Sequence, residues 1–90
     1  MTTMTQHEEN KRRAYQAAWQ FRRMRADGAP HTPETVALIR EGLALQIAAL
    51  DNASEPDEAV EAANDIAHAW NTGLTIAYTD KLAEKQAMTR

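Results

Sequence analysis

The sequence predicts an all-α protein, either a three-helix bundle or a helical hairpin with an additional N-terminal helix, that assembles into an oligomer. Three observations support this prediction. Helix-start and helix-stop signals divide the 90 residues into three segments. Apolar residues within those segments recur every three or four positions, and no segment alternates apolar and polar residues over the length of a strand. A chain of this length forms one domain, residues 1–90.

The first predicted helix spans residues 6–26. Thr5 and Glu8 form a capping-box pattern, in which the threonine hydroxyl accepts the amide of Glu8. Asp27–Gly28 is a stop signal, because glycine adopts the left-handed conformation without steric cost. A small apolar arc on this helix is enough to dock it on the rest of the chain.

The second predicted helix spans residues 33–50. Thr32 is its cap, Pro33 stands at the first helical position, and Asp51–Asn52–Ala53–Ser54 is a predicted turn. Its apolar arc covers nearly half the circumference, so we expect it to lie centrally, against the other two helices or against its own symmetry mate. The arc consists of two stripes: Val36, Ile39, Leu43, Ile47 and Leu50 on one, and Leu38, Gly42, Leu45 and Ala49 on the other.

The third predicted helix spans residues 55–87 and begins at Ser54–Glu55–Pro56–Asp57. Its apolar positions form a heptad seam, Val60, Ala63, Ala67, Trp70, Leu74 and Ala77, suited to an antiparallel hairpin with the second helix. Gly73 predicts a kink or a close helix crossing. Ala62, Ala69 and Ile76 lie on another side and would be exposed in a simple bundle, which favours an oligomer built on the second and third helices.

The composition excludes several classes of protein. The absence of cysteine rules out a disulfide framework and thiolate metal sites. No run of about 18 apolar residues exists to span a membrane, and no secretory leader pattern is present. We therefore expect a soluble cytoplasmic protein without cofactors.

Charge is strongly segregated along the chain. Six basic and no acidic residues lie between Lys11 and Arg25, whereas eight acidic residues and no lysine or arginine lie between Glu41 and Asp80. Such segregation usually produces distinct faces. The two faces either neutralise each other, within one chain or across an oligomer, or one of them binds a partner.

The basic segment of the first helix is the main candidate for a contact surface, which we call the basic–aromatic strip. Its cations and aromatic rings alternate at spacings of three and four, and Trp, Tyr and Arg dominate the energetics of protein interfaces. Alternatively, the rings belong to the core and the arginines only solubilise the helix, with cation–π support. The predicted partner-binding residues are Arg12, Tyr15, Trp19, Arg22 and Arg23.

An anionic ligand is the alternative to a protein partner. Lys11, Tyr15 and Arg22 could hold a nucleotide, which would make the protein an oligomeric nucleotide-binding or nucleotide-sequestering protein, for example an anti-defence sponge. The helical layout and the Trp70–Asn71 dipeptide faintly resemble phage-encoded helical-hairpin oligomers that sequester cyclic oligonucleotides, a likeness that assigns no family. Duplex nucleic acid is disfavoured by a sequence pI near 5.5.

Glu58, Glu61 and Asp65 form a predicted second, acidic surface on the third helix. With His68 they could also be read as metal ligands, but no His-Glu-x-x-His pattern or second cluster completes a coordination shell, so we expect no metal site. The only serine, Ser54, is explained as a cap, and no glycine-rich phosphate loop is present. The sequence therefore predicts a non-enzymatic regulatory or inhibitory binding protein, of the size of many phage and mobile-element adaptors.

Overall fold

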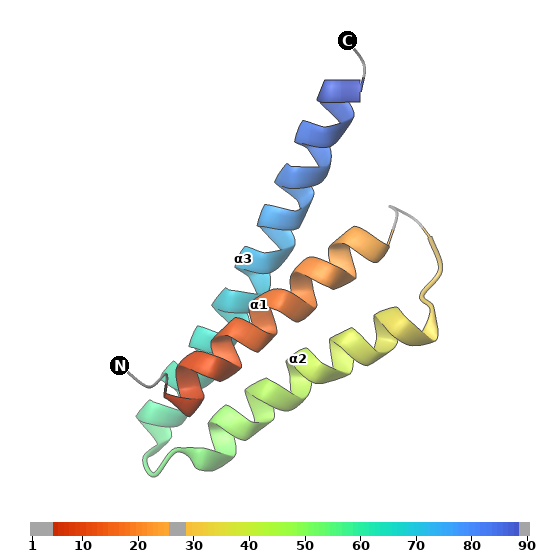
Figure 1. Ribbon diagram of the computed structural model, residues 1–90. Helices are drawn as coiled ribbons and strands as arrows, with labels where there is room; N and C mark the ends of the chain where they lie inside the picture. The colour runs from red at the N-terminus through yellow and green to blue at the C-terminus, as the bar shows by residue number, and fades with distance from the viewer. Residues whose placement is uncertain (1–4, 26–28, 89–90) are drawn as a thin grey trace.

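The computed structural model describes residues 5–25 and 29–88, and the chain is all-helical, as the sequence predicts (Figure 1). Its helices are α1 (Gln6–Met24), α2 (Pro33–Asn52) and α3 (Pro56–Met88). Within the described ranges no residue lies in a strand. The all-α prediction is confirmed.

The start of α1 shows the Thr5 half of the predicted capping box, and its end differs from the predicted boundary. The Thr5 hydroxyl accepts the Glu8 amide at 3.1 Å, which satisfies one of the free donors of the first turn. The helix ends at Met24, two residues before the predicted boundary, because Arg25 is already extended. The predicted stop at Asp27–Gly28 lies outside the described residues.

The start of α2 is a reciprocal capping box. The Thr32 hydroxyl accepts the Thr35 amide at 3.2 Å, and the Thr35 hydroxyl accepts the Thr32 amide at 2.9 Å. The predicted turn at residues 51–52 is wrong, since both residues belong to the last turn of α2 and the chain becomes extended only at Ala53. Asp and Asn are only mildly unfavourable in a helix, so without a glycine to terminate it the helix continues to the segment before Pro56.

Side-chain contacts at both ends of α1 show the relative direction of the helices. His7 contacts Asp65 and Arg23 contacts Glu84, so α1 and α3 run in the same direction. Helix α2 runs antiparallel to both, and the C-terminal part of α3 projects beyond α2 (Figure 1). The 33 residues of α3 span about 50 Å, which accounts for the longest dimension of the molecule, 53 Å.

The core is built mostly from small side chains. Its buried apolar residues are Ala14, Ala17, Ala18, Leu45, Ala49, Ile66 and Ala77.

 Small residues at the contacts let the helix backbones approach closely, at the expense of the area that each residue buries. Ile66 is the largest apolar side chain that is fully buried, and it lies at the centre of this core.

The buried face of α3 differs from the predicted seam, which was wrong in two respects. Ile66 was not part of that seam, and Ala62 and Ala69, which we expected to be exposed, pack against the core. Val60, a predicted seam residue, is exposed. The physical reason is that α3 packs against α1 as well as α2, so its buried face is rotated toward α1, whereas the predicted seam assumed a hairpin with α2. Ile76 is exposed, as expected.

Gly73 marks a close helix crossing and not a break, since α3 is continuous through it. A Cβ atom at Gly73 would collide with the Tyr15 carbonyl oxygen and would lie 2.9 Å from the Ala18 Cβ. The α1 backbone therefore lies directly against this position. Of the two alternatives that the sequence left open, the structure shows the close crossing.

Helix α2 contacts both other helices but buries only part of its apolar arc. Gly42, Leu45 and Ala49 are buried, whereas Leu43, Ile47 and Leu50 of the other stripe are about half exposed. We call Val36, Ile39, Leu43, Ile47 and Leu50 the outer stripe of α2. One chain therefore leaves a row of large aliphatic side chains in contact with solvent.

Candidate functional site

The C-terminal half of the basic–aromatic strip lies along the boundary between α1 and α3. The Trp19 indole Nε1 donates to Asp80 Oδ2 at 3.2 Å, and Arg23 Nη2 donates to Glu84 Oε1 at 2.9 Å. The Arg23 guanidinium also lies 5.4 Å from the centre of the Trp19 ring. These contacts hold both side chains against acidic residues of α3.

Arg22 and Tyr15 also lie along the boundary between α1 and α3. The Arg22 guanidinium lies 5.2 Å from the centre of the Tyr78 ring, and its Nη1 donates to the Arg25 carbonyl at 3.2 Å. Tyr15 is half-buried, and its backbone carbonyl faces Gly73. The Arg22 side chain and the Tyr15 backbone therefore both lie against α3.

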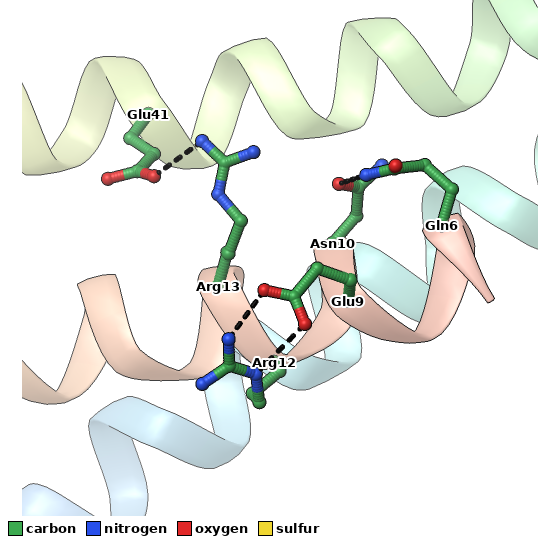
Figure 2. Close-up of polar contacts among 6 residues, drawn as sticks. All are labelled: Gln6, Glu9, Asn10, Arg12, Arg13 and Glu41. Carbon is green, nitrogen blue, oxygen red and sulfur yellow. Dashed lines mark hydrogen bonds and ion pairs between the residues drawn. The ribbon is translucent and has the colours of Figure 1, made fainter. Parts of the chain in front are cut away.

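The N-terminal half of α1 presents two arginines in different ways (Figure 2). Arg12 stays on its own helix, where its Nε donates to Glu9 Oε2 at 3.1 Å. Arg13 reaches to α2 and donates to Glu41 Oε1 at 3.0 Å. The hydrogen bond from Arg12 lowers the pKa of Glu9, and the same bond raises the pKa of Arg12. Arg12 is about half exposed, so its charge remains accessible at the surface.

One ion pair joins the basic and acidic segments of the sequence within one chain, between Arg13 and Glu41 of α2. Arg23 pairs with Glu84 of α3, which lies beyond the acidic segment. Both pairs are partly exposed, and such pairs contribute only about 0–1 kcal/mol each. Their main effect is to orient α1 on its neighbours.

The outer surface of α1 still carries a shallow hollow of about 320 Å³. It is lined by Tyr15, Gln16, Trp19 and Gln20. The two rings are partly exposed, and Gln16 and Gln20 are exposed. The hollow combines flat apolar surface with amide donors and acceptors, which is the chemistry of a protein contact.

The three residues proposed for an anion do not form one compact site. Lys11 and Arg22 are separated by about 16 Å along the axis of α1. Asp65 already provides a carboxylate near Lys11. Besides the hydrogen bond from His7, the positive charge of Lys11 helps to lower the pKa of Asp65. Tyr15, between them along the helix, faces Gly73 with its backbone.

The acidic surface is divided by a contact to α1. Glu58 and Glu61 are exposed in the first turns of α3, whereas Asp65 Oδ2 lies 3.0 Å from His7 Nε2. The hydrogen bond from His7 is the largest cause of the lowered pKa of Asp65. In the described part of the chain, no three His, Asp or Glu side chains are grouped to hold a metal ion.

The His7–Asp65 contact predicts a pH dependence of stability. Because the folded-state pKa of Asp65 is lowered, its contribution is fully present above the ordinary value of 3.8 and is lost as the pH falls through the lowered pKa. We expect Asp65→Asn to lower the melting temperature near pH 5 and to have a vanishing effect in stronger acid. Melting curves over this pH range check it, with Glu58→Gln as the control for loss of an exposed carboxylate on α3. An effect of Asp65→Asn that stays constant down to strong acid would contradict the prediction.

A groove between the helices was not foreseen from the sequence. It has a volume of about 350 Å³, and its lining includes Phe21, Ile39, Leu43, Gln46, Trp70 and Asn71. The Phe21 and Trp70 rings lie 6.0 Å apart, and a Cβ atom at Gly42 would lie only 2.7 Å from the Trp70 ring. Gly42 and Trp70 can be picked out in the sequence as unusual residues of their helices. Their contact depends on the register of α2 against α3, which the periodicity of apolar residues does not specify.

Comparisons with protein-family models, with curated proteins and with solved structures give no match for this chain. Among the helices described, none has an apolar stretch long enough to cross a membrane.

Proposed function

We propose that this protein is a small, non-enzymatic regulatory or inhibitory adaptor of the cytoplasm that binds another protein through the outer surface of α1. The observation that supports it most is the hollow lined by Tyr15 and Trp19, because the Trp19 indole is held in place by its hydrogen bond to Asp80 of α3. Side chains that are ordered before binding lose less conformational entropy in a complex. Gln16 and Gln20 at the hollow would supply amide donors and acceptors for polar groups of the partner.

The nucleotide alternative has less support from the geometry. Lys11 and Arg22 lie too far apart to hold one phosphate group, and Asp65 lies close to Lys11. We therefore expect a flat melting temperature across a panel of nucleotides. A salt-sensitive rise in melting temperature with one nucleotide would instead favour the sequestering function.

The protein-binding proposal predicts that Trp19→Ala combined with Arg23→Ala abolishes capture of a macromolecular partner by the tagged protein. The two changes remove an interface ring and a cation from α1, and helicity is checked by circular dichroism. Because Trp19 and Arg23 also contact α3, a matched control is needed. Asp80→Ala with Glu84→Ala removes the same contacts from the α3 side and leaves α1 unchanged.

We expect the control pair to retain capture. If capture survives the α1 changes, the proposal that the partner binds the outer surface of α1 is wrong. If both pairs of changes abolish capture, then the packing of α1 on α3, and not the α1 surface itself, is required.

A further inference from the structure

We propose that two copies of this chain associate by antiparallel pairing of α2 through its outer stripe. The stripe exposes large aliphatic side chains that the chain itself leaves uncovered: Leu43 is 53% exposed, Ile47 57% and Leu50 46%. Rows of this kind on a small protein commonly mark an interaction surface. The occupant that the chain specifies is a second copy of α2, for the reasons that follow.

The order of residues along the outer stripe is self-complementary about Leu45. Leu43 and Ile47 lie two residues before and after it, Ile39 lies six before, and Leu50 lies five after. An antiparallel copy therefore places Leu43 opposite Ile47 of the second copy, and Ile39 opposite its Leu50. A two-fold axis repeats both contacts, so all four aliphatic positions are used twice.

The charges at the edge of the stripe follow the same symmetry. Arg40 lies five residues before Leu45 and Asp51 six after it, and at about 100° per residue both lie on the same edge. The two-fold axis keeps that edge on one side, so Arg40 meets Asp51 of the second copy. Both side chains are exposed, and neither has an ion-pair partner among the residues that the structure describes.

A parallel pairing lacks this complementarity. Its two-fold axis would run along the helices and would place the Arg40 edges of the two copies on opposite sides of the contact, so Arg40 would not meet Asp51. On the opposite edge of the stripe, Ile39 and Leu43 line the groove at Trp70. Leu50 of the second copy would therefore cover the open side of that groove.

Light scattering and sedimentation over a concentration series test the association. We expect the mass to approach twice the 10.1 kDa of one chain. Ile47→Glu should shift the protein to a monomer, because it places two carboxylates in the apolar contact. Ala37→Glu adds the same charge to an exposed position of α2 outside the stripe and should remain dimeric. A monomeric mass for the wild type at all concentrations would overturn the proposal, as would a dimer that survives Ile47→Glu.

Cross-linking tests the register, since the natural chain contains no cysteine. In a mixture of Arg40→Cys and Asp51→Cys chains, a short bismaleimide should join position 40 of one chain to position 51 of the other. Each variant by itself should cross-link poorly, because the two copies of position 40 lie about 15 Å apart along the axis. Efficient cross-linking within the Arg40→Cys sample would overturn the register. Circular dichroism of each variant confirms that helicity is retained.

This inference is independent of the α1 surface. Loss of the dimer leaves Tyr15 and Trp19 in place, and loss of partner capture by the α1 variants leaves the outer stripe in place. The two sets of variants therefore separate failure of the dimer from failure of the adaptor function.

Discussion

Gly73→Ala is expected to destabilise the protein, although alanine normally favours a helix by about 1 kcal/mol over glycine. The added Cβ would collide with the Tyr15 carbonyl oxygen and approach the Ala18 Cβ. Neither can rotate away, because one is backbone and the other is fixed to it. Separating the helices leaves voids and lost contacts, so we expect a net cost of about 1–3 kcal/mol.

Gly42→Ala is the matched comparison for this prediction. There the new Cβ would meet only the ring of Trp70, at 2.7 Å, and Trp70 is half-buried at the edge of a groove. A side chain at a groove can shift, and the gain in helix propensity offsets part of the cost. We therefore expect Gly42→Ala to be milder than Gly73→Ala.

Thermal or denaturant unfolding of the two variants measures the difference. For a domain of this size, 1 kcal/mol corresponds to about 4–8 °C in melting temperature. Gly73→Ala should thus melt clearly below the wild type. An unchanged or higher melting temperature would show that the α1–α3 crossing is not as close as the structure indicates.

Ile66→Ala is expected to have the second large effect. Ile66 has 0% exposure and contributes a large apolar side chain to a core made mainly of alanine. Removing three of its carbon atoms costs transfer free energy and leaves a cavity, about 2–5 kcal/mol in total. Small domains are stabilised by only about 5–15 kcal/mol, so this loss is a large fraction of the whole.

Ile76→Ala is the control, since it makes the same change on the same helix at a residue that is 39% exposed. We expect its cost to be clearly smaller, because part of the side chain is already in water and little cavity is left. The free energies of unfolding of the two variants provide the test. Equal costs would mean that Ile66 is not the centre of the core.

These two predictions bear on function because the α1–α3 packing also positions the candidate contact surface. Trp19 and Arg23 are oriented by Asp80 and Glu84, which lie beyond Gly73 on the same helix. A change that separates α1 from α3 should therefore disturb the hollow at Tyr15 and Trp19. Partner binding by Gly73→Ala should fall together with stability.

The sequence determined the helical segments of this protein. Capping at Thr5 and Thr32 and the proline at the first position of each of α2 and α3 are local signals, since each acts within one turn of the helix start. The sequence encodes the helix ends less strongly than the helix starts. Asp51 and Asn52 tolerate a helix nearly as well as a turn, so their neighbours decided the outcome.

The tertiary structure decided which faces are buried and which charges are paired. Periodicity identified the apolar faces of α3, but Ile66 became the core centre only because α1 lies against Gly73. Likewise the basic–aromatic strip was evident in the sequence, whereas its contacts with Asp80 and Glu84 join residues 61 positions apart. Such contacts depend on the direction and register of whole helices, and these follow from the packing of all three, which no single segment encodes.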